Sequence, residues 1–255
     1  MSCSRRKLVA GNWKMYKTLA EGQELAMELR RLVSMVRQVD VAVIPPALLV
    51  APIAHTLRES NIGVGVQNIH GPGFGAYTGE LSSDMLAGTG ATYCLAGHSE
   101  RRKYFGETST MVNEKVKAIL TVDLVPILCI GETIEQRQAS ETFPVLKEQL
   151  LVGLTDLTDE QVAGLVVAYE PVWAIGTGHT ASAEQVEEVH TFLRTVLTDE
   201  FGSATAEKVR IQYGGSVKPS NAAELLHTPN VDGALVGGAS LDATSFADIV
   251  KAGKC

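Results

Sequence analysis

The sequence predicts an α/β protein with a (β/α)8 barrel, in which eight parallel strands are ringed by helices. Three observations support this fold class. Short aliphatic and β-branched runs alternate with amphipathic stretches along the whole chain. The runs are almost continuously apolar, as expected for parallel strands covered by helices on the outside. No linker, repeat or low-complexity tract interrupts the sequence, so we expect a single barrel domain over residues 1–255.

The predicted strands are the apolar runs between turn-forming residues. In chain order they are Leu8–Asn12, Val39–Ile44, Ile62–Gln67, Thr92–Ala96, Leu124–Ile130, Leu165–Tyr169, Val209–Tyr213 and Gly233–Val236. Two of the stretches between them begin with a capping box, Thr18 with Glu21 and Ser182 with Gln185, and continue as apolar stripes of helical period. The alternative is an open, doubly wound sheet. That fold would carry G-x-G-x-x-G after its first strand, and the segment 10–14 lacks this pattern.

Charge and hydrophobicity exclude several classes of partner. The 22 basic and 29 acidic residues give a net charge of -7, which repels nucleic acid and anionic membrane surfaces. The first residues lack the apolar core of a secretory signal. The longest apolar stretch, Val41–Ala54, is too short to span a bilayer, and its three prolines favour a strand end followed by a loop. We therefore predict no membrane association.

Cysteine usage indicates a reducing compartment. None of the four cysteines forms a C-x-x-C pair, and Cys94 and Cys129 lie within apolar strand-like runs. Buried free thiols of this kind are typical of cytoplasmic proteins. The sequence therefore predicts a cytoplasmic location.

In a (β/α)8 barrel, chemistry takes place at the carboxyl ends of the strands. Two glycine-rich turns, Gly214-Gly215-Ser216 and Gly237-Gly238, follow the seventh and eighth predicted strands. Such turns expose backbone N–H groups to an anion at a helix start, so we expect a phosphate group there. Ordinary tight turns are the alternative for each pair.

Acid–base residues are predicted at the ends of two further strands. Glu170 ends the sixth run, where partial desolvation would make it a stronger base toward a carbon-bound proton. His98 ends the fourth run at the start of an expected helix, which disfavours imidazolium and leaves a neutral ring that donates to a carbonyl oxygen. A salt bridge at the barrel rim and a locally hydrogen-bonded histidine are the structural alternatives.

Asn12 ends the first predicted strand and Lys14 lies two residues beyond it. Both side chains are predicted to enter the mouth of the barrel where the other strand ends meet. The lysine would attract an anionic substrate and stabilise a developing enediolate, while Asn12 would fix the geometry. A Schiff base on Lys14, as in barrel aldolases, is the competing chemistry. After Glu170 comes a predicted lid that would exclude water and offer the Gly176 N–H to phosphate. It consists of Pro171, Val172, Trp173, Ala174, Ile175, Gly176 and Thr177, and a fixed hydrophobic loop is the alternative.

These motifs resemble the signature motifs of the triosephosphate isomerase family and occur in the same order along the chain. The segments concerned are AGNWK (10–14), AGHSERR (96–102), AYEPVWAIGTG (168–178), YGGSV (213–217) and LVGGA (235–239). The resemblance implies a TIM barrel that interconverts dihydroxyacetone phosphate and D-glyceraldehyde 3-phosphate in glycolysis and gluconeogenesis, without metal or organic cofactor. The family is itself a standard illustration of a glutamate base paired with a neutral histidine.

The resemblance also implies residue roles. Glu170 matches the family's base and His98 its neutral electrophile. The substrate and phosphate contacts are matched by Asn12, Lys14, Gly176, Ser216, Gly237 and Gly238. The glycine-rich segment 70–80, with Thr78 near its tip, resembles the family loop that enters a second subunit and so implies a homodimer. Another phosphate-binding barrel enzyme and a non-catalytic barrel remain alternatives.

Overall fold

A computed structural model describes residues 5–71, 73–175 and 180–254. The strands hydrogen-bond in sequence order and β8 pairs with β1, which closes a parallel barrel. They are β1 (Lys7–Asn12), β2 (Val39–Ile44), β3 (Ile62–Val66), β4 (Tyr93–Ala96), β5 (Val125–Ile130), β6 (Val166–Tyr169), β7 (Arg210–Tyr213) and β8 (Gly233–Val236). The predicted fold class is confirmed, and the open-sheet alternative is wrong because Leu8 pairs with Gly233 across the closure.

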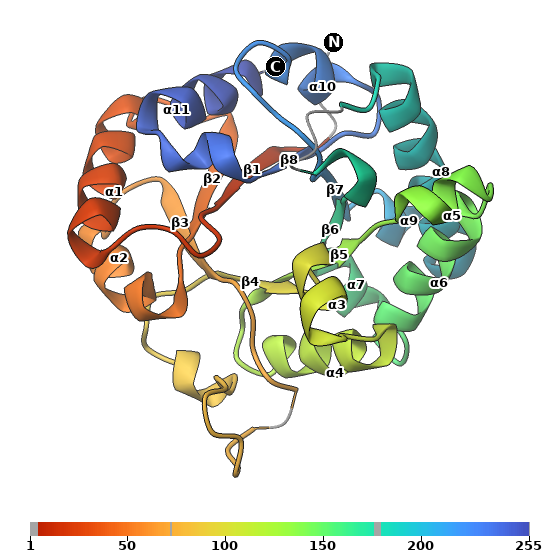
Figure 1. The fold of residues 1–255 in the computed structure, drawn as a ribbon, viewed down its shortest axis with the longest axis horizontal. Coiled ribbons are helices and arrows are strands. Elements are labelled where there is room, and N and C mark those ends of the chain that lie inside the picture. The colour runs from red at the N-terminus through yellow and green to blue at the C-terminus, as the bar shows by residue number, and fades with distance from the viewer. Residues whose placement is uncertain (1–4, 72, 176–179, 255) are drawn as a thin grey trace.

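Helices surround the barrel on its outer side (Figure 1). They are α1 (Leu19–Val33), α2 (Val50–Thr56), α3 (Ser99–Phe105), α4 (Ser109–Leu120), α5 (Ile134–Gln138), α6 (Thr142–Gly153), α7 (Asp159–Gly164), α8 (Ala183–Phe201), α9 (Ser203–Ala206), α10 (Ala222–His227) and α11 (Ala243–Ala252). Both predicted capping boxes are formed, by Thr18 with Glu21 at α1 and by Ser182 with Gln185 at α8. Local sequence therefore sets where these two helices begin.

The segment after β2 departs from the expected loop. A 3-10 turn at Ala47–Leu49 leads directly into α2, which contains Pro52 in its first turn. Proline is tolerated there because first-turn N–H groups have no acceptor within the helix. The prediction of a loop over this stretch is wrong from residue 47 onward.

Side-chain alternation along the strands directs specific residues into the mouth. In β1, Leu8 and Ala10 belong to the cluster inside the barrel, while Val9 packs in the outer layer against the helices. In β6, Val166 and Ala168 likewise face inward. Because strand side chains alternate with a period of two, the next inward positions are residues 12 and 170, at the carboxyl ends of the strands.

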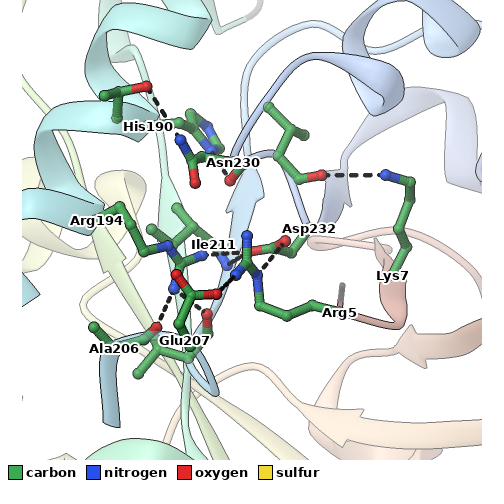
Figure 2. A network of polar contacts seen from close by, with 12 residues as sticks. Arg5, Lys7, His190, Arg194, Ala206, Glu207, Ile211, Asn230 and Asp232 are labelled. Atoms are coloured by element: carbon green, nitrogen blue, oxygen red, sulfur yellow. Dashed lines mark hydrogen bonds and ion pairs between the residues drawn. The ribbon is translucent and has the colours of Figure 1, made fainter. Parts of the chain in front are cut away.

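A charged network lies at the opposite, amino-terminal end of the strands (Figure 2). Asp232, which precedes β8, accepts hydrogen bonds from Arg194 at 2.5 Å, from Arg5 at 2.7 Å and from the Ile211 N–H at 3.0 Å. Arg194 also donates to the Val209 carbonyl at 2.6 Å. Both members of the Arg194–Asp232 pair are buried. The network therefore ties α8, β7, β8 and the N-terminal segment together without using the mouth.

His190 of α8 is fully buried beside the rings of Tyr169 and Tyr213. One ring nitrogen, Nδ1, lies 3.1 Å from the Asn230 carbonyl and therefore carries the proton that it donates. Burial lowers the pKa of His190 from 6.5 to about 4. The ring is consequently neutral in the folded protein at neutral pH.

This burial predicts an acid-dependent loss of stability. Between pH 6.5 and pH 4 the unfolded chain binds a proton at His190 that the folded chain does not, so the free energy of unfolding falls as the pH falls. The loss is expected to reach about 3 kcal/mol and to level off below pH 4. Urea unfolding of the parent and of His190→Gln across this range measures it. Equal pH slopes in the two proteins would contradict the prediction.

Candidate active site

A cavity of about 630 Å³ opens at the carboxyl ends of the strands, a size typical of small-ligand sites. The nominated residues on its wall are Asn12, Lys14, His98, Glu170, Ile175, Ser216, Gly237 and Gly238. They come from the last residue of β1 and from the segments that follow β1, β4, β6, β7 and β8, and the closed barrel brings them to one mouth. Gly176 and Thr177 lie outside the described residues.

His98 caps the amino terminus of α3 with its own ring. Its Nδ1 accepts the backbone N–H of Glu100 at 3.2 Å, so Nδ1 carries no proton in this arrangement. The proton then resides on Nε2, which lies 3.0 Å from Oε1 of Glu170. The helix start predicted at His98 is confirmed, and it fixes which ring nitrogen faces the cavity.

Glu170 is buried at the floor of the cavity and held by two donors. Oε1 faces His98, and Oε2 accepts the backbone N–H of Ser99 at 2.8 Å. The Glu170 N–H donates to the Ile130 carbonyl at 2.8 Å, which continues the β5–β6 ladder by one residue. The carboxylate therefore rests in a defined position beside the imidazole.

The ionisation of this pair differs from the sequence-based expectation. Burial opposes charge on Glu170, but His98, the Ser99 N–H and Lys14 outweigh it and hold the carboxyl pKa below 4.5. Burial likewise opposes charge on His98, yet the Glu170 and Glu100 carboxylates raise its pKa above 6.5. For the substrate-free site, the expectation of a Glu170 pKa raised by desolvation is wrong, because the facing His98 ring stabilises the charged carboxylate. The neighbouring carboxylates likewise favour charge on His98, whereas the Glu100 N–H bonded to Nδ1 favours the neutral ring that was expected.

Lys14 is held in an uncommon backbone conformation. Its φ of 51° lies in the left-handed region, which costs free energy for a residue with a Cβ. The Asn12 side chain accepts the Lys14 N–H at 3.0 Å, and Gln67 donates to the Lys14 carbonyl at 2.7 Å. The ammonium lies 2.5 Å from Glu100. Glu100 was expected at the mouth as a strand-end polar residue but was assigned no role, and Gln67 was not nominated, although it lies just beyond the end of β3.

The glycine turns fit closely around these side chains. A Cβ added to Gly214 would lie 2.9 Å from Cγ of Glu170, and one on Gly237 would lie 3.3 Å from Cε of Lys14. Both turns border the cavity together with Ser216. Small residues here therefore leave room for the acid–base groups as well as exposing backbone to an anion.

The segment after Glu170 forms a 3-10 turn over Val172–Ala174. Ile175 lines the cavity, but the Trp173 indole N–H donates to Glu132 at 2.9 Å, and the guanidinium of Arg137 lies 4.7 Å from the centre of its ring. Trp173 and Val172 border a neighbouring cavity instead. In the described part of the predicted lid, Ile175 therefore contributes to the reaction cavity, whereas Val172 and Trp173 do not.

The segment between β3 and β4 extends away from the barrel (Figure 1). Thr78 and its neighbours there are exposed. Among the residues the structure describes, no group of three or more His, Cys, Asp or Glu is arranged to hold a metal ion. Within the same residues, no helix has the length and apolar character needed to cross a membrane.

Comparison with known proteins gives one family over nearly the whole chain. The model of the triosephosphate isomerase family matches residues 7–253. A triosephosphate isomerase of Carboxydothermus hydrogenoformans is 51% identical, covering 97% of this chain and 98% of its own. That of Endomicrobium trichonymphae is 47% identical, with 98% and 100% covered. The crystal structure of triosephosphate isomerase from Bartonella henselae has 40% identity and a TM-score of 0.88, covering 97% of this chain and 98% of its own. The chain belongs to the triosephosphate isomerase family.

Proposed function

We propose that Glu170 and His98 carry out the family reaction, which interconverts dihydroxyacetone phosphate and D-glyceraldehyde 3-phosphate through an enediolate. The single observation behind this assignment is the 3.0 Å approach of the carboxylate to the Nε2 of His98 inside the cavity. A base and a hydrogen-bond donor at that separation reach adjacent atoms of one three-carbon substrate.

In the proposed mechanism, Glu170 removes a proton from the carbon next to the carbonyl while Nε2–H of His98 donates to the carbonyl oxygen. Lys14 stabilises the negative charge that develops on the oxygens. Once Glu170 has taken the proton, its charge no longer raises the pKa of His98. The ring then favours its neutral form, whose Nε2–H gives its proton to one enediolate oxygen. The same nitrogen can then take the proton from the neighbouring hydroxyl, while Nδ1 stays bonded to the Glu100 N–H.

The resting contacts of Glu170 require a movement before catalysis. Oε2 is held by the Ser99 N–H, so the carboxylate must exchange this bond for an approach to the substrate carbon. The proposed lid, from Pro171 to Thr177, would close over the mouth and exclude water at the same stage. The phosphate would lie against Ser216, Gly237 and Gly238, with Gly176 joining from the lid.

An assay of D-glyceraldehyde 3-phosphate isomerisation tests the function, and treatment with borohydride in the presence of substrate separates it from aldolase chemistry. We expect rapid isomerisation that survives borohydride. Covalent inactivation at a lysine would favour a Schiff-base enzyme, and a folded protein without isomerase activity would favour a non-catalytic barrel.

We also propose that the chain acts as a homodimer. A second cavity of about 630 Å³ adjoins the first and shares Asn12, Lys14 and His98 with it. Large apolar side chains at its edge, Met15 and Leu48, are more than 90% exposed. Such apolar exposure beside a site favours coverage by another chain. The segment around Thr78 projects from the barrel, and we propose that this segment of a second copy covers the cavity.

The dimer proposal predicts the behaviour of a loop variant. Thr78→Arg should shift the sedimentation of the protein from dimer toward monomer at micromolar concentration and lower its specific activity on dilution. The reason is that a bulky charged side chain would enter the second cavity of the other subunit, beside its apolar edge. Thr195→Arg, on the exposed surface of α8, serves as the control and should remain dimeric. A parent protein that sediments as a monomer with full activity would contradict the proposal.

We further propose that the chain forms one domain over residues 1–255 and works in the cytoplasm without a metal or organic cofactor. The free, buried thiols of Cys94 and Cys129 support a reducing compartment. The net charge of -7 supports a small phosphorylated substrate over nucleic acid.

A further inference from the structure

Gln149 of α6 forms a two-point hydrogen-bonded clamp on a single residue. Its Oε1 accepts the Gly131 N–H at 2.8 Å, and its Nε2 donates to the Gly131 carbonyl at 3.1 Å. The side chain is buried and reaches across from the helix layer to the end of β5. Gln149 thus satisfies both backbone groups of Gly131 just where the β5–β6 pairing ends at Ile130 and Tyr169.

Gly131 is pressed against the backbone that carries Glu170. A Cβ at Gly131 would lie 1.9 Å from the Glu170 carbonyl oxygen, so the two backbones are in direct contact. The Glu170 N–H donates to the carbonyl of Ile130, the residue that precedes Gly131. Any rotation of the Gly131 peptide therefore displaces the main chain of Glu170.

Gly131 is followed directly by Glu132, the residue that holds the first part of the predicted lid by hydrogen bonds. The next residue, Glu132, is fully buried and accepts from the Tyr169 hydroxyl at 3.1 Å and from the Trp173 indole at 2.9 Å. Its carbonyl accepts the Val172 N–H at 3.1 Å. A change in the orientation of Gly131 would therefore move Glu132 and its contacts on both sides of Glu170, to Tyr169 before it and to Val172 and Trp173 after it.

We propose that Gln149 is a positioning residue for the isomerisation, holding the Gly131 peptide so that Glu170 is correctly placed toward substrate. This inference rests on the proposed function of Glu170. It assigns a catalytic consequence to a side chain that never touches the substrate, since Gln149 is absent from the wall of the reaction cavity and borders the neighbouring one.

Asn113 of α4 provides a matched control. It is also a buried amide clamp, donating to the carbonyls of Gly153 at 3.0 Å and Thr155 at 2.9 Å at the far end of α6. Loss of its hydrogen bonds removes comparable stabilisation without touching the Glu170 segment. Gln149→Met and Asn113→Leu both replace an amide with an apolar side chain of similar length.

Steady-state kinetics of these variants test the inference. Gln149→Met should lower kcat roughly ten- to a hundredfold with KM changed by less than about threefold, because a base misplaced by a fraction of an ångström loses turnover rather than affinity. Asn113→Leu should keep the parent kcat even if its thermal midpoint falls as far as that of Gln149→Met. Parent-like kcat in folded Gln149→Met, or an equal loss of kcat in both variants, would overturn the proposal.

A pH-dependent rescue distinguishes positioning from general destabilisation. Gln149→Glu keeps the acceptor for the Gly131 N–H but places a carboxylate oxygen against the Gly131 carbonyl. On acidification the carboxyl gains a proton, which restores the missing donor, so its kcat relative to the parent should rise as the pH falls. The relative kcat of Gln149→Met should not change with pH. A flat ratio for Gln149→Glu would overturn the proposal.

Other charged groups bordering the same cavity are Arg102 and Lys103 from α3 and Glu135 from α5, and they are unchanged in every variant. The isomerase activity of the parent distinguishes failure of the proposed function from failure of the Gln149 proposal. An inactive parent removes the proposed function, whereas an active parent with fully active Gln149 variants removes only the role of Gln149.

Discussion

Replacing Glu170 by aspartate is expected to lower the kcat for isomerisation of D-glyceraldehyde 3-phosphate about a hundredfold while KM changes by less than about threefold. Shortening the side chain by one methylene withdraws the carboxylate from the substrate carbon but leaves the phosphate contacts intact. The shorter side chain also loses its 3.0 Å approach to His98. Steady-state kinetics in both directions of the reaction measure the effect.

The control for this prediction is Glu135→Asp, which makes the same change on the exposed surface of α5. It should retain the kcat of the parent. A Glu170→Asp variant with parent-like turnover would mean that another group removes the proton. A rise in KM alone would assign Glu170 to binding.

The largest stability effect is expected at the other end of the barrel. Arg194→Met should lower the free energy of unfolding by about 3–5 kcal/mol, because it leaves the buried Asp232 carboxylate with one charged partner fewer. Arg5 and the Ile211 N–H remain on Asp232 but cannot replace the 2.5 Å contact to Arg194. Urea unfolding at a fixed protein concentration measures the change.

A double variant separates charge from packing at this site. Combining Arg194→Met with Asp232→Asn removes the buried negative charge that has lost its Arg194 partner and keeps an acceptor for the Ile211 N–H. The double variant should therefore recover part of the lost stability. Because the network lies away from the mouth, the kcat of the folded single variant should match the parent. If the double variant is less stable than Arg194→Met alone, the charge argument is wrong.

The strands and the residues at their ends were predictable because both depend on short-range pattern. Apolar runs of four to six residues mark the barrel strands. Alternation along β1 and β6 then carries Asn12 and Glu170 into the mouth. The capping boxes at Thr18 and Ser182 gave the start of two helices, since the signal lies within four residues.

The features that sequence reasoning missed depend on distant contacts. The pKa of Glu170 is set by a ring 72 positions away along the chain, so desolvation judged from the local run predicted the wrong direction. The clamp between Gln149 and Gly131 joins a helix to a strand end, and no local pattern identifies it. The prolines near α2 suggested a loop, although Pro52 fits the first turn of a helix.

The most direct test of proton transfer by Glu170 is isomerisation in D2O, followed by NMR at the carbon next to the carbonyl. The parent should convert D-glyceraldehyde 3-phosphate rapidly and place solvent deuterium on C1 of the dihydroxyacetone phosphate formed, the former aldehyde carbon, because a proton held by a carboxylate exchanges with solvent. Glu170→Gln, which cannot accept the proton, should lose both conversion and deuterium uptake while still binding inorganic phosphate. Rapid conversion with deuterium uptake by Glu170→Gln would contradict the account.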